Sequence, residues 1–318
     1  WDPGFSDASY GFRPGRSAHQ AVERAQEHIR AGYAHVVDLD LEKFFDRVNH
    51  DILMGLVAKR VADKRLLRLI RGFLTAGVLD GGLVGPTTEG TPQGGPLSPL
   101  LSNLMLDVLD KELEKRGHRF VRYADDCNIY VRSRRAGERV MASVTRFLVR
   151  RLKLKVNADK SAVDRPSARA FLGFSFTAAR ATKRRIAPQA LARFKARVRE
   201  MTRRTRSVSL ARLVAELSRY LVGWRGYFGF CETPSILLIL DRWVRRRLRA
   251  FVWQQWKRGR TRFAALRRLG VNKHLAAKTA GSAHGPWRLS NSPALAYALP
   301  NAFLKRIGLA SLRGRPAA

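Results

Sequence analysis

The sequence predicts an α+β fold in residues 1–179 and an all-helical fold in the rest of the chain. Short β-branched and apolar runs alternate with stretches of helical periodicity in the first part, whereas only helical periodicity continues after Arg180. The charge changes at the same point, because residues 1–179 hold 29 lysines and arginines against 21 acids and residues 180–318 hold 32 against 4. A chain of 318 residues is long enough for two such domains, each with its own core.

The first part should contain short strands, longer helices and one irregular segment. Brief β-branched and apolar runs predict strands at residues 36–41, 120–123, 128–131 and 171–176. Apolar residues at helical spacing predict helices at residues 51–72, 100–115 and 139–152. So few residues separate the two middle strands that they should form a β-hairpin. The segment 81–95 is rich in Gly, Thr and Pro, so we expect a loop or hairpin there.

Helices with arginine-covered faces are expected in the second part, at residues 188–205, 210–228 and 237–256. Their large aromatic residues recur at helical spacing, so most of them should form the core of a helix bundle. They are Trp224, Tyr227, Trp243, Trp253 and Trp256. Any functional role of these helices therefore rests on the arginines.

The net charge of +36 implies a polyanionic partner, either nucleic acid or an anionic membrane surface. A ribosomal-type basic protein would share this charge, so charge alone leaves the class open. No apolar run approaches the roughly 20 residues that span a bilayer, so no membrane segment is expected. The only cysteines, Cys127 and Cys231, have neither a disulfide framework nor zinc spacing. A reducing, cytoplasmic location is therefore expected.

Three carboxylates stand where strands end. Asp40 closes the predicted strand at 36–41, and Asp125 and Asp126 occupy the tip of the predicted hairpin. Phosphoryl transfer from a nucleotide uses two divalent cations about 3.5–4 Å apart, and such cations take carboxylate oxygens as ligands. Ordinary turn chemistry is the alternative for Asp125 and Asp126, because Asp tolerates hairpin backbone angles.

Six blocks in order across residues 5–176 resemble the reverse transcriptases encoded by group II introns, and they favour the catalytic reading of the carboxylates. The blocks are residues 9–17 (SYGFRPGRS), 37–46 (VDLDLEKFFD), 90–99 (GTPQGGPLSP), 123–126 (YADD), 154–161 (LKVNADKS) and 171–174 (FLGF). This resemblance implies a right-hand polymerase palm, an antiparallel sheet with helices, together with partial fingers.

The basic part resembles the maturase, or X, domain of the same proteins, which also serves as the polymerase thumb. The resemblance lies in residues 223–228 (GWRGYF), 240–248 (LDRWVRRRL), 287–290 (WRLS) and 298–301 (ALPN). It implies three regions: fingers and palm at 1–179, a helical thumb or X domain at 180–270, and its extension at 271–318. The chain starts at Trp1 without Met and ends without paired Cys and His. We therefore expect an N-terminally truncated member of the endonuclease-lacking type, which binds RNA but polymerises feebly.

The resemblance implies an RNA-directed DNA polymerase of a mobile, retrotransposing intron that also assists splicing. Its cofactor would be two Mg²⁺ ions, with Mn²⁺ possible. Its partners would be the intron RNA template, a DNA primer or target and deoxynucleoside triphosphates, in a bacterial cytoplasm or nucleoid. Two alternatives stay open: an RNA-binding maturase without polymerase activity, and a domesticated reverse transcriptase in phage defence or diversification.

Site residues follow from the same motifs. Asp40, Asp125 and the carbonyl of Leu41 would hold metal, with Asp126 beside them as a further catalytic carboxylate, while Asp38 and Asp46 should be structural. The nucleotide would contact Phe45, Pro92, Gln93, Gly94 and Lys160, although Lys160 also fits an exposed surface lysine. The expected nucleic-acid contacts are Arg13, Arg16, Tyr123, Arg225, Arg245, Arg246 and Arg247.

Overall fold

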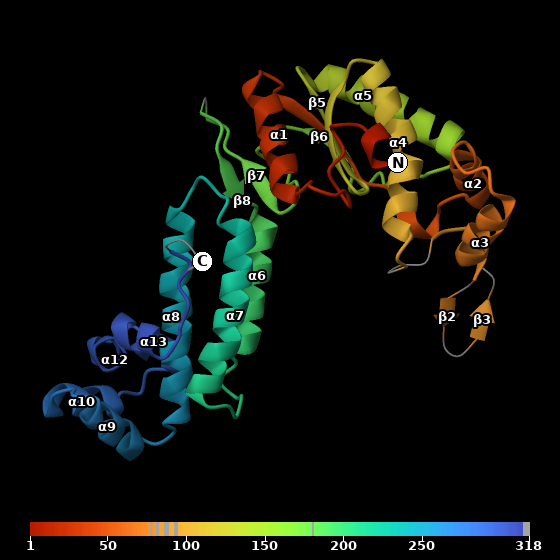
Figure 1. Ribbon diagram of the computed structural model, residues 1–318. Helices are drawn as coiled ribbons and strands as arrows, with labels where there is room; N and C mark the ends of the chain where they lie inside the picture. Colours follow the sequence, from red (N-terminus) through yellow and green to blue (C-terminus); the bar gives the residue numbers. More distant parts are fainter. Residues whose placement is uncertain (77, 81–82, 86–88, 92–94, 180, 314–318) are drawn as a thin grey trace. The chain divides into compact units, whose positions relative to one another are not determined.

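The computed structural model describes residues 1–76, 78–80, 83–85, 89–91, 95–179 and 181–313. It divides into two compact units, Trp1–Arg184 and Arg185–Ala318 (Figure 1). The α+β fold followed by a helical region is confirmed, because β1 to β7 all precede Arg184 and the longest helices follow it. The division lies slightly beyond the expected boundary at 179/180, and residues 271–318 belong to the same compact unit as the helices before them.

A four-stranded antiparallel sheet organises the first unit. Its order is β4 (Arg119–Tyr123), β5 (Asp126–Val131), β1 (His35–Leu39) and β6 (Ala162–Asp164). β4 and β5 form the expected hairpin, since Tyr123 pairs with Asp126 and only two residues lie between them. β1 pairs with β5 in the register that sets Leu39 against Cys127. The hairpin turn and the end of β1 therefore lie together at one end of the strands, and this end is the sheet edge that carries the acidic residues.

The two faces of this sheet carry different side chains, because successive strand residues alternate in direction. One face contributes Leu39, Cys127 and Ile129 to the main core, and helices α4 (Ser98–Lys115) and α5 (Arg134–Phe147) cover it. On the other face, the Tyr130 ring lies 5.3 Å from the ring of His28 in α1 (Ala18–Arg30). The acidic residues near the hairpin turn stand on this second face.

Several helices differ from the sequence prediction for local reasons. Residues 51–72 form two helices, α2 (His50–Ala58) and α3 (Lys64–Thr75), because the Asp63 side chain accepts from two backbone N–H groups and starts a new helix. The helix expected at 139–152 begins at Arg134 and finishes in a π-helical turn, η3 (Leu148–Leu152). Helix α1 was not predicted, although a capping box between Ser17 and Gln20 marks its start.

Short strands complete the first unit. β2 (Val78–Asp80) and β3 (Leu83–Gly85) pair with each other, so the irregular segment at 81–95 includes part of a hairpin. The strand expected at 171–176 shortens to β7 (Phe174–Phe176). A further short strand, β8 (Arg184–Ile186), begins at the boundary of the two units, where the sequence predicted only helices.

Helices α6 (Pro188–Met201), α7 (Leu210–Phe228) and α8 (Ser235–Gln255) confirm the three expected helices of the second unit within a few residues (Figure 1). Of the five aromatic residues expected in its core, Trp253 is fully buried, and Trp224, Tyr227, Trp243 and Trp256 are half-buried. The ring of Trp224 lies 4.4 Å from that of buried Phe194. Short helices follow: α9 (Gly259–Arg268), α10 (Lys273–Ala280), α11 (Pro286–Leu289), α12 (Pro293–Ala298) and α13 (Asn301–Arg306). Among the described residues, no helix has the length and apolar character needed to cross a membrane.

The close packing of α5 on the sheet gives a stability prediction. A Cβ added at Gly137 would stand 2.4 Å from Val163 Cγ1, so Gly137→Ala overpacks this contact and should lower the free energy of unfolding by about 1–3 kcal/mol. Gly72→Ala in α3 is the control, because nothing lies within 4 Å of its added Cβ and Ala favours a helix by up to about 1 kcal/mol. Thermal denaturation of both variants checks this, and equal midpoints would contradict the close packing.

Candidate active site

One edge of the central sheet gathers acidic side chains from distant parts of the chain. Asp40 directly follows β1, and Asp125 and Asp126 lie at the turn between β4 and β5. The register that pairs Leu39 with Cys127 places Asp40 opposite Asp126 at its next step. Residues opposite each other in an antiparallel pair have Cβ atoms about 5 Å apart. The fold thus brings together the three carboxylates that the sequence singled out.

Repulsion among these carboxylates is felt most strongly at Asp126. Burial at the sheet edge, together with the charges of Asp125, Asp38 and Asp40, raises the pKa of Asp126 to about 6. Because Asp126 keeps exposed surface, water moderates the burial contribution and the neighbouring carboxylates are the specific cause. A divalent cation would relieve this repulsion, and carboxylate oxygens are its preferred donors. In the described part of the chain no group of three acidic, His or Cys side chains is arranged to hold a metal ion, so the two predicted Mg²⁺ ions stay a prediction.

Asp38 is neutralised by a protein side chain instead. Arg169 Nη2 lies 2.7 Å from Asp38 Oδ2, in a partly buried ion pair. Burial raises the pKa of Asp38, and the bond from Arg169 opposes that rise. This contact fits the structural role expected for Asp38. Among the residues that the structure describes, no ion pair reaches Asp125 or Asp126.

A turn at residues 157–161 supports Asp40 from the other side. The backbone N–H of Asn157 donates to the Asp40 carbonyl at 2.9 Å, and the Asp40 N–H donates to Ser161 Oγ at 3.0 Å. Lys160 Nζ stands 3.9 Å from Asp40 Oδ1, and its side chain is 68% exposed. So long and exposed a pair is weak, which leaves Lys160 able to exchange Asp40 for another anion. Its contact with a triphosphate stays a prediction.

The segment after Asp40 sets an aromatic ring beside a loop. Leu41 is buried and forms a bridge with Val156, and the short helix η2 (Phe44–Asp46) follows. The ring of partly buried Phe45 lies 5.3 Å from the ring of buried Phe44. The roles predicted for the Leu41 carbonyl and for Phe45 stay predictions.

The loop that follows Gly90 begins against Phe45. The Thr91 N–H donates to the Phe45 carbonyl at 2.6 Å, and Gly90 adopts a φ of +97° while its N–H donates to the Val48 carbonyl. A Cβ at Gly90 would approach the Phe45 carbonyl to 2.9 Å. The next residues, Pro92, Gln93 and Gly94, lie outside the described residues, so their predicted contact with a nucleotide is untested.

Behind the acidic turn lies a buried ion pair. The side chains of Arg122 and Asp110 are both 0% exposed, and Arg122 Nη2 and Nε lie 2.6 and 2.7 Å from the two Asp110 oxygens. Arg122 also donates to the carbonyl of Ala124 at 2.8 Å and to Ser9 Oγ at 2.8 Å. Asn103 Oδ1 accepts a further bond at 3.1 Å. One guanidinium thereby ties the turn to α4 and to the N-terminal segment.

The turn that this guanidinium holds is strained. Ala124 has a φ of +56°, a region that residues other than Gly rarely adopt. Gly11 packs directly against it, because a Cβ at Gly11 would stand 2.2 Å from the Ala124 nitrogen. Asn103 Nδ2 holds Gly11 in place by donating to its carbonyl at 2.8 Å. Asp125 is therefore presented by a backbone that its surroundings fix.

The surroundings of Arg13 argue against its predicted template contact. Its side chain is 4% exposed, forms an ion pair with Asp2 and donates to the carbonyls of Ser6 and Ser9. These bonds leave the guanidinium facing the protein interior. Arg13 therefore fastens the N-terminal segment, which in turn positions Gly11.

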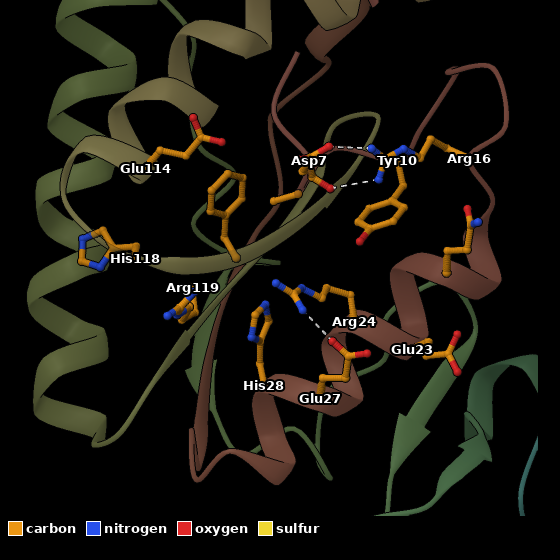
Figure 2. A pocket seen from close by; sticks show the side chains of 13 residues that line it. Asp7, Tyr10, Arg16, Glu23, Arg24, Glu27, His28, Glu114, His118 and Arg119 are labelled. Atoms are coloured by element: carbon orange, nitrogen blue, oxygen red, sulfur yellow. Dashed lines mark hydrogen bonds and ion pairs between the residues drawn. The ribbon is translucent and has the colours of Figure 1, made fainter. Parts of the chain in front are cut away.

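Arg16 is placed differently. Figure 2 shows its guanidinium paired with Asp7 beside the Tyr10 ring, and all three residues line a cavity of about 470 Å³. The Asp7 side chain is 96% exposed, so the 2.7 Å ion pair with Arg16 is one that solvent weakens. A template contact by Arg16 stays a prediction, as does that by Tyr123, the last residue of β4.

The arginines of the second unit that were predicted to bind RNA differ in their contacts with the protein. Arg247 donates to Thr202 Oγ1 and to the backbone carbonyls of Arg199 and Thr202. Arg246 stacks on Trp287, 3.9 Å from the ring centroid. Arg247 is thus largely committed to protein, which argues against its predicted RNA contact. Arg225 and Arg245 line a cavity, and their RNA contacts stay predictions.

Several residues that position the acidic turn and Asp40 were not predicted from the sequence. They are Arg122, Asp110, Asn103, Arg169 and Ser161. Arg122 gave one usable signal, because it stands in a strand directly before the acidic turn, where an arginine needs a buried partner. Nothing local identifies that partner as Asp110, since the two meet only through the packing of α4 on the sheet.

The contact between Gly11 and the turn predicts a large effect from a small change. Gly11→Ala forces apart two backbone segments, so it should lower the free energy of unfolding by about 1–3 kcal/mol or more. Gly15→Ala in the same segment is the control, because its Cβ would meet nothing within 4 Å and only its φ of +70° is unfavourable; that costs about 1–2 kcal/mol. Chemical denaturation measures both, and a loss no larger for Gly11→Ala would refute the tight docking of this segment.

Comparison with known proteins agrees with this geometry. Residues 3–176 match the family described as reverse transcriptase (RNA-dependent DNA polymerase), and residues 191–270 match the group II intron, maturase-specific domain. Protein YkfC of Escherichia coli (strain K12) is 41% identical over 120 residues, which is 36% of this chain and 32% of that protein. Group II intron-encoded protein LtrA of Lactococcus lactis subsp. cremoris is 41% identical over 111 residues, 35% of this chain and 18% of LtrA.

Among solved structures, apo telomerase from Candida tropicalis aligns with 94% of this chain and 54% of its own, at a TM-score of 0.46 and 13% identity. The chain spans about a third or less of the length of the two curated relatives. The reverse transcriptase match covers more than half of the 318 residues and contains every element of the acidic site. The chain therefore belongs to the reverse transcriptase (RNA-dependent DNA polymerase) family.

Proposed function

We propose that this chain carries the catalytic palm of an RNA-directed DNA polymerase and a basic helical region that binds RNA. The observation that carries the proposal is the convergence of Asp40, Asp125 and Asp126 at one sheet edge, with Lys160 3.9 Å from Asp40. The reaction would add a deoxynucleotide to a primer 3′ end, with release of pyrophosphate.

The residues divide the work by charge and position. Asp40 and Asp125 would hold the two Mg²⁺ ions, which supply activation of the primer hydroxyl and charge neutralisation at the leaving pyrophosphate. Asp126, whose pKa is raised to about 6, tunes the negative charge of the cluster. Lys160 is exposed and weakly paired, so it is available to a phosphate oxygen of the incoming nucleotide. The fixed turn behind Asp125 keeps the carboxylates preorganised.

Phe45 is proposed as the gate that excludes ribonucleotides. Its ring packs on buried Phe44, and the loop beginning at Thr91 bonds to its backbone. A rigid ring beneath the sugar would leave no space for a 2′-hydroxyl. Selection would then be steric, with the surrounding contacts keeping the ring from moving aside.

The second unit is proposed to bind the template RNA and to assist splicing of an intron that encodes the protein. Support comes from its 32 lysines and arginines against 4 acids from residue 180 onward, and from the match to the maturase-specific domain. Intron RNA, a DNA primer or target and deoxynucleotides would be the partners. A maturase without polymerase activity is the competing function, and the assembled carboxylates disfavour it because RNA binding alone makes no use of clustered negative charge.

Asp40→Asn and Asp125→Asn should each reduce primer extension on an RNA template at least about a hundredfold, because each removes charge that stabilises the transition state. RNA affinity should stay unchanged, since neither residue carries the positive charge that binds phosphate. Asp159→Asn is the matched control: Asp159 is exposed in the same supporting turn and forms no ion pair in the described part of the chain.

Electron paramagnetic resonance can measure Mn²⁺ binding to the same site, independently of polymerase activity. Both site variants should bind fewer ions than wild type, and the control should not. Wild-type levels of extension and of bound Mn²⁺ in either variant would reject the assignment. A wild-type protein that binds RNA and Mn²⁺ but extends no primer would instead favour the maturase function.

Phe45→Val should raise ribonucleotide incorporation relative to deoxyribonucleotide incorporation about tenfold or more, since a smaller side chain leaves space for the 2′-hydroxyl. Phe44→Leu serves as the control, because Phe44 is 2% exposed and belongs to the core. Single-nucleotide incorporation with matched triphosphates gives the ratio. An unchanged ratio in Phe45→Val, with extension intact, would make Phe45 another core aromatic.

A further inference from the structure

Two adjoining cavities on the second unit form one basic groove along α8. A cavity of about 390 Å³ and one of about 740 Å³ share Arg245 and Asn301 in their linings. We call this feature the α8 groove. Its basic residues are Arg225, Arg242, Arg245, Arg246, Arg249, Lys305 and Arg313.

The α8 groove carries an uncompensated positive charge. None of its described lining residues is acidic. The second unit has four carboxylates, of which Glu200 and Glu216 pair with arginines outside the groove. Asp241 pairs with Arg245 at 3.1 Å, but it is 3% exposed and also accepts from Ser311 and Leu312. Asp241 therefore anchors the wall of the groove and offsets one charge of seven.

Protein carbonyls and side chains hold part of this charge in fixed positions. Arg249 donates to the Leu299 carbonyl at 3.1 Å, and Arg246 donates to the Trp287 carbonyl at 3.0 Å. Burial and the neighbouring charge of Arg245 lower the pKa of Arg249, which a bound anion would reverse. Arg242, Lys305 and Arg313 are exposed, and their side chains have no partner among the described residues. Fixed and free cations therefore face the same space.

The mixed cavity of the first unit provides a contrast. Its lining combines Arg16, Arg24 and Arg119 with Asp7, Glu23, Glu27 and Glu114, and Figure 2 shows Arg24 paired with Glu27. Arg16 pairs with Asp7 in the same lining, so opposite charges face this cavity together. The described lining of the α8 groove has no acid, so it favours a polyanion.

The shape of the groove favours unpaired nucleotides over a duplex. A pocket of roughly 300–1,000 Å³ suits a ligand of nucleotide size, and both cavities fall in this range at about 390 and 740 Å³. Trp243, Asn291 and Asn301 line the smaller one. Arg199 lies 5.7 Å from the centroid of the Trp243 ring, and Asn301 Oδ1 accepts from Arg249 at 3.3 Å. Indole rings stack on unpaired bases, and side-chain amides bond to base edges. A duplex would present its phosphates to the rim and leave these groups unused.

We propose that the α8 groove binds an unpaired polynucleotide strand, with phosphates on Arg242, Lys305 and Arg313 and a base against Trp243. This deepens the RNA binding proposed for the second unit and rests on it. Arg247 is not among the residues that line the groove. Its guanidinium bonds instead to Thr202, at the end of α6. The strand can be RNA or DNA, because both share the phosphodiester chemistry.

The test uses the full 318-residue chain and two matched triple variants. The groove variant combines Arg242→Gln, Lys305→Gln and Arg313→Gln. The control variant combines Arg258→Gln, Arg260→Gln and Lys278→Gln, which removes the same charges from exposed positions at the start of α9 and on α10, outside the groove. In the described part of the chain none of these six side chains forms a hydrogen bond or ion pair, so both variants should unfold at the wild-type temperature.

Fluorescence anisotropy measures binding of labelled oligouridylate, oligothymidylate and a fully paired RNA duplex across a salt series. The groove variant should bind both single strands about tenfold or more weakly than the control variant. Its log–log salt slope should be shallower by about 2, since each lost single-strand phosphate contact contributes about 0.7. The loss on duplex should be no larger than that of the control variant. Different losses on the two single strands would show which strand the groove prefers.

Two outcomes separate this inference from the function on which it rests. Tight binding by wild type with equal losses in the two variants would overturn the groove and leave RNA binding intact. Weak binding of every probe by wild type, with a shallow salt slope, would overturn RNA binding by the second unit itself. A larger loss on duplex than on single strands would also overturn the proposal, because the groove would then act only as a charged rim.

Discussion

The buried ion pair between Arg122 and Asp110 is the interaction on which the acidic site depends. Both side chains are fully buried, and the Arg122 guanidinium donates hydrogen bonds to Asp110, Asn103, Ser9 and the Ala124 carbonyl. Breaking such a pair by removing one partner costs about 3–5 kcal/mol, because a charge is left uncompensated. The pair thus holds the strained turn at Ala124, and through it the direction in which Asp125 points.

Each of the two units holds a cluster of like charges, negative in the first unit and positive in the second. At the sheet edge, burial and the charges of Asp125, Asp38 and Asp40 raise the pKa of Asp126. A rigid fold holds this cluster together, and a bound cation would lower the repulsion within it. In the second unit the arginines repel one another in the same way, and a polyanion is the matching partner. The proposed polymerisation would use both, since it requires metal ions for the chemistry and positive charge for the template phosphates.

The sequence predicts the position of a side chain where neighbouring residues alone determine it. Asp40, Asp125 and Asp126 could be located because short strands and a two-residue turn bring them to one edge. Arg122 and Arg169 could not be assigned, because their partners Asp110 and Asp38 are chosen by helix packing and by a distant loop. The partners of Arg13 could not be predicted for the same reason, since its bonds to Asp2 and Ser6 depend on how the N-terminal segment folds back.

The run Arg245–Arg247 shows why a basic sequence overstates a basic surface. Consecutive helical residues turn by about 100°, so the third of three neighbours faces away from the first. Arg245 and Arg246 both line the α8 groove, where Arg246 also stacks on Trp287, whereas Arg247 bonds to Thr202. Residues spaced by three or four share a face instead, which is why Arg242, Arg245, Arg246 and Arg249 meet in one cavity. Phosphate contacts on a helix are therefore to be sought by spacing along one face, and a run of adjacent arginines also supplies the bonds that hold the helix in place.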